Sequence, residues 1–313
     1  MNRPLMQVVD PQTGESDPAA IRQVFDAQLA TALKWRESTA AERIARLKKL
    51  REAMLARRDD FYAAFEKDYR KPSAEVDATE LMPVLDEIRH AIGNLKKWMK
   101  PTRVWPTMGT VGTRAWIQYQ PRGRSLIVAP WNFPLNLCFG PMVSALAAGC
   151  PVILKPSEMT PSVSTVMAEV IADTFAPEEV ALFEGSLPTS QALLDLPFDH
   201  IFFTGSPAVG KVVMAAAAKH LTSVTLELGG KSPVIVDETA DLDLALRALL
   251  FGAVGTAGQR CTTTRRLFVH ASRYDELVGK LVKAYGQVRI GNPLEPDVLM
   301  GPLIDRAAVE AYR

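Results

Sequence analysis

A cysteine in a polar loop is the residue of this chain with the clearest chemistry of a nucleophile. Cys261 lies in the segment 258–264, Gly-Gln-Arg-Cys-Thr-Thr-Thr, directly after Arg260. A neighbouring cation and backbone amides favour the thiolate, which is the reactive form of cysteine. The other two cysteines, Cys138 and Cys150, lie in apolar surroundings that indicate the core. We therefore expect Cys261 to be a catalytic nucleophile.

Two more polar residues follow apolar runs that are typical of strands. Glu227 opens the sequence Glu-Leu-Gly-Gly, and a carboxylate partly removed from water there would suit a general base. Asn132 lies within Pro-Trp-Asn-Phe-Pro, where prolines and aromatic residues can hold an amide N–H toward an oxyanion. The alternative for Asn132 is an ordinary turn residue.

The segment 202–213, FFTGSPAVGKVV, looks almost like a triphosphate-binding loop. Gly205 and Gly210 stand five residues apart and Lys211 follows, but Val212 occupies the position where that loop needs a magnesium-binding hydroxyl. A strand, a tight turn and a helix can still direct backbone N–H groups at an anion. A plain connection between strand and helix is the alternative.

Lys155 and Glu158 end another predicted strand, in the sequence Lys-Pro-Ser-Glu. An ammonium and a carboxylate at a strand end can hydrogen-bond the two hydroxyls of a ribose, although an exposed polar turn would look the same. Two such strand ends in one sheet indicate an adenosine diphosphate site.

Short apolar runs alternate with helical patterns from residue 125 onward. This alternation predicts an α/β fold with a parallel sheet covered on both faces, which binds ligands at the carboxyl ends of its strands. Helices are expected in the first hundred residues, where Thr39 and Glu42 fit a capping box, and an extended ribbon at about 109–123. The predicted strands are Ser125–Ala129, Pro151–Leu154, Val180–Glu184, His200–Phe203, Val224–Leu228, Pro233–Val236 and Arg265–His270. Helices are predicted from near Leu135, Pro161, Thr189 and Ala208, from Asp241 to about Gly258, and up to about Val288.

The composition indicates a globular enzyme of the cytosol. Hydrophobic residues make up 48% and charged residues 23% of the 313 positions, with a net charge of +1, so neither nucleic acid nor an anionic membrane is an expected partner. Three cysteines without metal-binding spacing fit a reducing compartment, and the first residues lack an apolar run of signal-peptide length. The uncharged stretch 125–154 is long enough to span a bilayer, but its prolines favour a strand, a helix and a second strand inside one core.

Taken together, these motifs resemble the aldehyde dehydrogenase superfamily. PWNFP, KPSE, FTGSPAVG, ELGG and GQRC occur in the family's order and at about its spacings, from roughly Val8 to the last residue. The segments Leu187–Ser206 and Glu227–Pro233 are most similar to the class 3 or coniferyl aldehyde group. The segment Val254–Thr263 looks more like the aminoadipic semialdehyde group.

The resemblance implies a role for each motif. Cys261 would attack the aldehyde, Asn132 and the Cys261 N–H would stabilise the oxyanion, and hydride would pass to a nicotinamide. Glu227 would activate the water that hydrolyses the thioester. The implied cofactor is NAD, with NADP as the alternative, and Glu158 would favour NAD. The residues implied to bind the cofactor are Trp131, Lys155, Glu158, Gly205, Ser206, Gly210 and Leu228.

The resemblance also implies the domain plan. Residues 1–232 would form N-terminal helices and an NAD-binding domain with a parallel open sheet, and residues 233–313 part of an α/β catalytic domain. The family's later Glu-x-Phe-Gly-Pro segment is absent, so we expect a C-terminally truncated chain that binds NAD weakly and has little activity. The full-length form is expected to be a homo-oligomer. The alternatives are a non-catalytic remnant, a P-loop-like nucleotide triphosphatase and a cofactor-free acyl-transferring cysteine enzyme.

Overall fold

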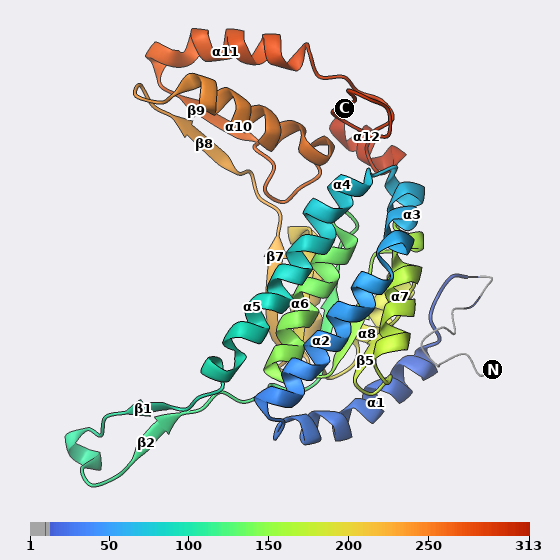
Figure 1. The fold of residues 1–313 in the computed structure, drawn as a ribbon, viewed down its shortest axis with the longest axis vertical. Helices are drawn as coiled ribbons and strands as arrows, with labels where there is room; N and C mark the ends of the chain where they lie inside the picture. The colour runs from blue at the N-terminus through green and yellow to red at the C-terminus, as the bar shows by residue number, and fades with distance from the viewer. Residues whose placement is uncertain (1–9, 11–12) are drawn as a thin grey trace. The chain divides into compact units, whose positions relative to one another are not determined.

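The computed structural model describes residue 10 and residues 13–313. The described chain divides into two compact units (Figure 1). The first comprises the residues up to Ala64 together with Ala74–Glu227, and the second comprises Phe65–Ser73 and Leu228–Arg313. The chain therefore passes between units at Glu227–Leu228, whereas the sequence prediction divided the domains after residue 232 and kept 65–73 in the first.

Helices dominate the N-terminal hundred residues, as the periodicity predicts. They are α1 (Pro18–Trp35), α2 (Ala40–Ala56), α3 (Arg58–Tyr69), α4 (Ser73–Val76), the π-helical turn η2 (Asp77–Leu81) and α5 (Met82–Trp98). Helix α2 begins with the predicted capping box, in which Thr39 and Glu42 satisfy each other's backbone N–H groups. Leu47, Leu50 and Met54 of α2 are fully buried.

The extended ribbon differs from the prediction in its bounds. Strand β1 (Thr102–Val104) pairs antiparallel with β2 (Ala115–Ile117), and a short 3-10 helix, η3 (Met108–Thr110), lies between them. The predicted range 109–123 therefore contains only the second of these strands. The period-two pattern that gave the prediction begins at Trp116, and β1 is a short strand that lacks such a pattern.

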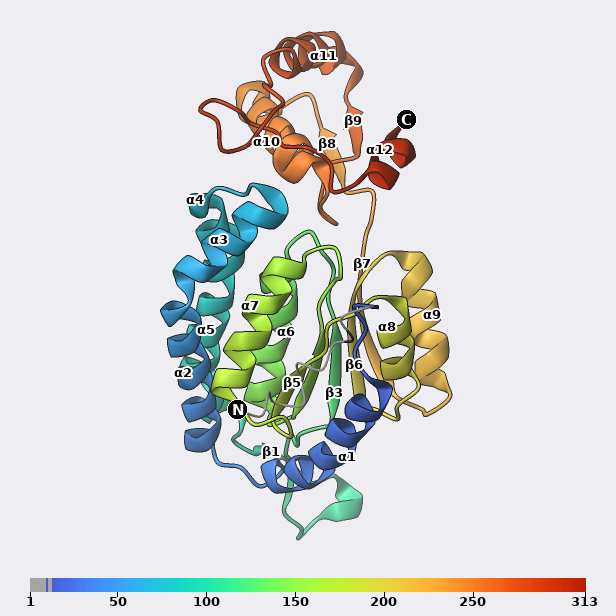
Figure 2. The ribbon, with the colours of Figure 1, turned by 90° about the vertical axis from the view of Figure 1, so that its right-hand side faces the viewer.

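Five strands form the central sheet of the first unit, in the order β5-β4-β3-β6-β7. Parallel pairing joins β3 to β4, β3 to β6 and β4 to β5. Helices α6 and α7 lie on one face of the sheet and α8 and α9 on the other (Figure 2). The predicted α/β fold is confirmed, with strand ends that differ from the predicted ones by no more than two residues. The strands are β3 (Ser125–Val128), β4 (Val152–Lys155), β5 (Val180–Leu182), β6 (His200–Gly205) and β7 (Ser223–Leu228), and the helices are α6 (Pro134–Ala148), α7 (Pro161–Thr174), α8 (Leu187–Leu194) and α9 (Pro207–Ala218).

The uncharged stretch 125–154 is the centre of this core. It forms β3, α6 and most of β4, and every residue of β4 is buried. Among the residues that the structure describes, no helix combines the length and the apolar character needed to cross a bilayer. The predicted strand–helix–strand interpretation of this stretch is therefore confirmed.

The second unit has a small core of its own, formed by Val236, Leu242, Leu249 and Leu277. Strand β8 (Pro233–Val236) pairs parallel with β9 (Arg266–Val269), and α10 (Leu242–Val254) and α11 (Ala271–Tyr285) carry the other core residues. The predicted helix to Gly258 is wrong in its last turn, because α10 ends at Val254 and the turn η4 (Gly255–Gly258) follows. A last helix is α12 (Arg306–Tyr312).

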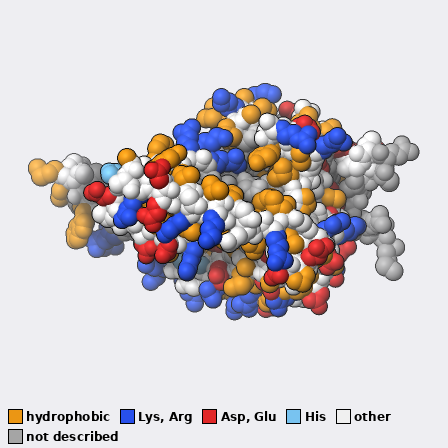
Figure 3. Space-filling model, turned by 90° about the horizontal axis from the view of Figure 1, so that it is seen from above, with side chains coloured by type: hydrophobic (Ala, Val, Ile, Leu, Met, Phe, Trp, Pro, Cys, Tyr) orange, Lys and Arg blue, Asp and Glu red, His pale blue; other side chains and the backbone are white. Residues whose placement is uncertain are grey.

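On the face that Figure 3 presents, charged side chains of both signs lie among hydrophobic ones. This mixture agrees with the net charge of +1.

Glu15 ties the N-terminal segment to the sheet by binding the N-terminus of α8. Its carboxylate accepts hydrogen bonds from the backbone N–H groups of Ser186 and Thr189, at 3.0 and 3.1 Å, and from both of their hydroxyls. Burial acts to raise the Glu15 pKa, but the hydrogen bonds from Ser186 and Thr189 outweigh it and the pKa is lowered. Gly185 has a φ of +143°, and a Cβ there would meet Thr189 Oγ1 at 2.1 Å and Glu15 Oε2 at 2.7 Å. Glycine is therefore required for this close approach.

We expect Glu15→Gln to lower the free energy of unfolding by about 1–2 kcal/mol at neutral pH, the scale of charge-assisted bonds at a helix N-terminus. Because folding lowers the Glu15 pKa, its contribution is present above the unfolded-state pKa and is lost as the pH falls through the folded-state pKa. Urea unfolding at a series of pH values measures this, with exposed Glu37→Gln as the charge-matched control. A deficit that is the same at acidic and neutral pH would contradict the role of the Glu15 charge.

Candidate functional site

The predicted cofactor-binding segments leave the sheet at one edge. Because β3, β4, β5 and β6 run parallel, the segments that follow them all begin at the carboxyl ends of their strands. The chain turns toward opposite faces after β3 and β6, which are neighbours in the sheet. This is the topological switch point at which open α/β sheets bind ligands. Lys155 and Ser206 lie at the ends of β4 and β6, on either side of β3.

Lys155 is a buried cation at this edge. Its side chain is 3% exposed, and Nζ donates to the Pro156 carbonyl at 2.8 Å and lies 3.4 Å from a Glu158 carboxylate oxygen. Burial lowers the Lys155 pKa, and the Glu158 charge acts in the opposite direction. The Glu158 side chain is 52% exposed. The structure therefore brings together the two side chains that the sequence predicted for a ribose, with one in the core and the other open to a ligand.

Ser206 caps the helix that follows β6. Its Oγ accepts from the Val209 N–H at 3.3 Å, and Gly210, buried in α9, donates its N–H to the Ser206 carbonyl at 2.9 Å. A Cβ at Gly205 would come within 2.5 Å of the Phe203 ring, so packing alone excludes a larger residue. Lys211 lies exposed on α9. The lookalike of a triphosphate loop is thus a strand, a one-residue turn and a helix.

Asn132 lies half-buried in the turn between β3 and α6, next to half-buried Trp131. Its Oδ1 accepts from the Phe133 N–H at 3.1 Å. The Nδ2 group is the donor of this amide, and an oxyanion would require that end of the side chain. The geometry agrees with an oxyanion donor and also with a turn residue, so the role of Asn132 stays a prediction.

Glu80 holds the start of α6, directly after the turn that contains Asn132. The sequence analysis did not predict this role. It is fully buried in the π-helical turn η2, where a carboxylate oxygen accepts from the Asn136 N–H of the first turn of α6 at 3.0 Å. The Asn136 side chain in turn donates to the Thr79 carbonyl at 3.1 Å. A signal was present in the sequence, since Val76, Glu80 and Val84 recur at a spacing of four on a helical face that is otherwise apolar.

The helix N-termini at this edge are satisfied in different ways. Those of α6 and α8 each hold an internal carboxylate, from Glu80 and Glu15. That of α9 is capped by the neutral hydroxyl of Ser206. Since a helix N-terminus attracts negative charge, α9 is better placed than α6 or α8 to receive a bound anion.

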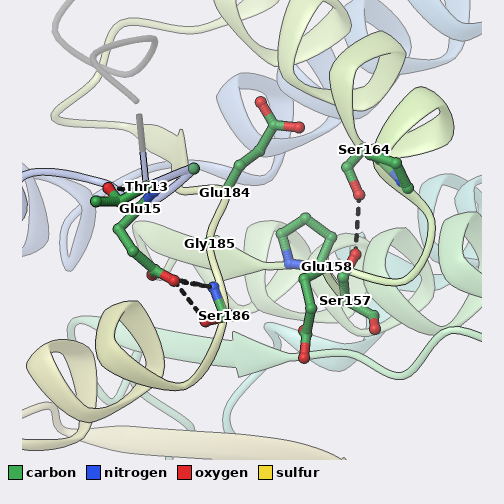
Figure 4. A pocket seen from close by; sticks show the side chains of 11 residues that line it. Thr13, Glu15, Ser157, Glu158, Ser164, Glu184, Gly185 and Ser186 are labelled. Atoms are coloured by element: carbon green, nitrogen blue, oxygen red, sulfur yellow. Dashed lines mark hydrogen bonds between the residues drawn. The ribbon is translucent and has the colours of Figure 1, made fainter. Parts of the chain in front are cut away.

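A cavity of about 410 Å³ lies beside Glu158 at the same edge. Figure 4 shows its walls, which come from the segments after β4 and β5 and from the chain before α1. The lining residues are Thr13, Gly14, Glu15, Pro156, Ser157, Glu158, Pro161, Ser164, Glu184, Gly185 and Ser186.

Cys261 lies exposed in the second unit, in the loop between η4 and β9. Thr263 holds this loop, because its Oγ1 donates to the Gly258 carbonyl at 2.9 Å and accepts from the Arg260 N–H at 3.2 Å. The turn before it is strained, since Thr256 and Ala257 have φ angles of 56° and 53°, in the left-handed region.

Arg260 is engaged within its own loop. Its Nε donates to Thr256 Oγ1 at 3.0 Å, and its guanidinium carbon lies 5.4 Å from the centre of the Phe251 ring. Such contacts fix the loop that carries Cys261.

The other two cysteines are buried, as predicted. Burial raises the pKa of Cys138 to about 12, because it disfavours the thiolate. Cys150 is 4% exposed. Cys261 is therefore the exposed one of the three thiols.

Glu227 is exposed near the end of β7, and Leu228 after it is half-buried. The expected desolvation of Glu227 is therefore not seen in this chain. Asn132 and Glu227 belong to the first unit and Cys261 to the second, so their approach to one another remains a prediction.

The comparisons with known proteins agree with the resemblance inferred from the sequence. A family model described as "Aldehyde dehydrogenase family" matches residues 3–313. The 4,4'-diaponeurosporen-aldehyde dehydrogenase of Staphylococcus aureus is 42% identical over 245 residues, which are 77% of this chain and 53% of that protein. Aldehyde dehydrogenase family 3 member A2 of Macaca fascicularis is 36% identical over 267 residues, 85% of this chain and 54% of that protein.

A solved NAD+ complex of an aldehyde dehydrogenase from Bacillus cereus has the same fold. It superposes with a TM-score of 0.85 at 30% identity, covering 95% of this chain and 60% of that chain. The chain thus spans little more than half the length of its relatives. The predicted similarity to the class 3 group is confirmed, while the likeness to the aminoadipic semialdehyde group around Cys261 stays a prediction. The chain belongs to the aldehyde dehydrogenase family.

Proposed function

We propose that this chain carries the adenosine half of a nicotinamide dinucleotide site, together with the nucleophile and general base for oxidising an aldehyde to a carboxylic acid. The observation that carries the proposal is the buried Lys155, paired with Glu158 at the carboxyl end of β4. Family membership supplies the reaction class.

The residues at the switch point fit an adenosine diphosphate group. A buried ammonium and a half-exposed carboxylate can share the two hydroxyls of one ribose, as donor and acceptor. The diphosphate would lie at the N-terminus of α9, where no internal carboxylate competes. Gly210, Trp131 and Leu228 are proposed to contact the cofactor as the resemblance implies. When bound, the nicotinamide would supply the hydride acceptor.

The chemistry of the chain's own residues follows from their types. The Cys261 sulfur would attack the aldehyde carbon, and the Asn132 Nδ2 and the Cys261 N–H would donate to the developing oxyanion. After loss of hydride a thioester remains on Cys261. Glu227 would then take a proton from the water that attacks the thioester carbon, releasing the carboxylic acid and the Cys261 thiolate.

One role open to Arg260, which directly precedes Cys261, is to bind a second carboxylate on the substrate. Its bond to Thr256 and its contact with Phe251 favour the other role, in which it shapes the loop around Cys261. We therefore propose a substrate class defined by the aldehyde group alone.

The exposed ribbon favours the expected homo-oligomer. Large apolar side chains gather on it, with Trp105 79%, Met108 95% and Tyr119 79% exposed. Apolar surface of this kind typically marks an interaction site.

Native thiol labelling tests the nucleophile first. We expect one thiol per folded chain to react rapidly with an aromatic disulfide reagent, and Cys261→Ala to abolish that reaction, because Cys138 and Cys150 are buried. Full reaction of three thiols after unfolding in urea is the internal control. Rapid labelling that survives in Cys261→Ala would contradict the assignment.

The role of Glu227 is tested by separating the first turnover from the following ones. In an active full-length form of the protein, Glu227→Gln should leave the first formation of reduced cofactor intact and slow later turnovers by roughly 10²–10⁴-fold, the usual contribution of a general base. Stopped-flow absorbance with excess aldehyde measures both phases, and Glu238→Gln, an exposed carboxylate of the second unit, serves as control. Loss of the first phase would mean that Glu227 acts before hydride transfer.

A further inference from the structure

A second cavity, of about 380 Å³, lies in the first unit between the C-terminal parts of α5 and α6 and the chain that follows β2. Its volume is in the range of small-molecule sites, about 300–1,000 Å³. Apolar side chains form much of its wall, among them Leu95, Trp98, Val143 and Ala147. The wall shares no described residue with the cavity beside Glu158.

Arg43 of α2 is the basic residue among the described residues of this wall, and it is 5% exposed. Its Nε donates to the Ser38 hydroxyl at 2.9 Å. Its Nη1 donates to the carbonyls of Ala147 and Ala148, at the end of α6, at 3.1 and 2.7 Å. Burial lowers the Arg43 pKa, because it disfavours the charged form. No carboxylate of a described residue forms an ion pair with this guanidinium, so its charge is balanced by neutral oxygens alone.

The Nη2 group of Arg43 has no acceptor in the described chain, since the hydrogen bonds of this side chain are those of Nε and Nη1. Nη2 is not among the fully buried polar atoms that lack a partner there, so it reaches solvent. The cavity is the open space that Arg43 borders, and Nη2 can therefore donate to a molecule inside it. A buried guanidinium with N–H groups still to offer is suited to a carboxylate.

The charge of the surrounding chain also suits an anion. No acidic residue occurs from Ile88 to Ser157, and this stretch supplies all the described residues of the wall except Arg43 and Glu87. The same stretch carries Lys96 and Lys97, both exposed in the last turn of α5. Glu87 is exposed, so water and salt screen its charge.

We propose that this cavity binds a small monocarboxylate with an apolar chain or ring. The carboxylate would accept from the Arg43 Nη2, and the apolar part would lie against Leu95, Trp98 and Val143. A phosphate or sulfate suits the cavity less, because its further oxygens would face apolar side chains that offer no donor. The binding does not rest on the proposed function, although the product of the proposed oxidation is a carboxylic acid.

Calorimetric titration of the whole chain with 4-phenylbutanoate and with 4-phenylbutanamide tests the proposal, because the two probes have the same apolar part and differ in charge. The acid should bind at least about tenfold more tightly than the amide, on the scale of a hydrogen bond between charged groups. Glu87→Gln should tighten binding of the acid about twofold and leave the amide unchanged, since it removes an exposed carboxylate from the wall. The charge-matched control is Glu52→Gln, exposed on α2 and outside the wall, which should change neither affinity. Equal affinities for acid and amide, or no binding of the acid, would overturn the proposal.

Ala148→Phe tests where the acid binds. Ala148 is exposed at the end of α6 and lines the cavity, so a phenyl ring there would occupy space that the probe needs. The affinity for the acid should fall at least about tenfold. The same change at an exposed position of α9, Ala215→Phe, should leave it unaltered.

Arg43→Gln should remove the preference for the acid over the amide. Circular dichroism shows whether this variant folds without its bonds to the end of α6, and if it does not, Ala148→Phe decides alone. Binding of the acid at wild-type strength in Ala148→Phe would place the probe outside this cavity and contradict the proposal.

Discussion

A parallel sheet directs the N-termini of its helices to one edge, and the unpaired N–H groups there need partners. This constraint accounts for much of the first unit. Helix α6 receives the buried carboxylate of Glu80, α8 receives that of Glu15, and α9 is capped by Ser206. Two of these helix ends are thus filled by acidic residues from the N-terminal part of the chain. Helix α7, which follows β4, has no side-chain cap, and α9 has only a neutral cap at the switch point where such sheets bind ligands.

The buried Lys155 adds the opposite charge to the same edge. Burial of an ammonium group is costly unless it is hydrogen-bonded and paired, and the Pro156 carbonyl and Glu158 provide both. The pairing leaves the Glu158 carboxylate half-exposed, so a ligand hydroxyl can join it. Lys155 and Glu158 together thus offer at this edge one buried donor and one half-exposed acceptor.

The sequence predicted the sheet because its strands are apolar runs bounded by proline and glycine. Pro134, Pro161 and Pro207 each stand at the first position of a helix, where the missing N–H costs nothing, and the predicted helices begin within two residues of them. Lys155 and Glu158 could be predicted as a pair because they are three residues apart at a strand end.

Other features could not be predicted because they depend on distant contacts. Glu15 is 171 positions from Ser186, and Glu80 is 56 positions from Asn136. The end of α10 was missed for a different reason. Thr256 and Ala257 adopt left-handed backbone angles, which residues other than glycine rarely adopt. Nothing in their residue types marks the end of the helix, so the sequence prediction extended the helix too far. The exposure of Glu227 was missed because strand patterns do not show which strand ends are covered.

The proposed function requires that the carboxyl edge of the sheet hold an adenosine diphosphate group at Lys155 and α9. A crystal structure of the chain with ADP-ribose tests this requirement directly. We predict ribose hydroxyls within hydrogen-bond distance of the Lys155 Nζ and the Glu158 carboxylate, and the diphosphate against the first turn of α9. A diphosphate at the N-terminus of α8 with Glu15 displaced, or a ligand away from this edge, would contradict it.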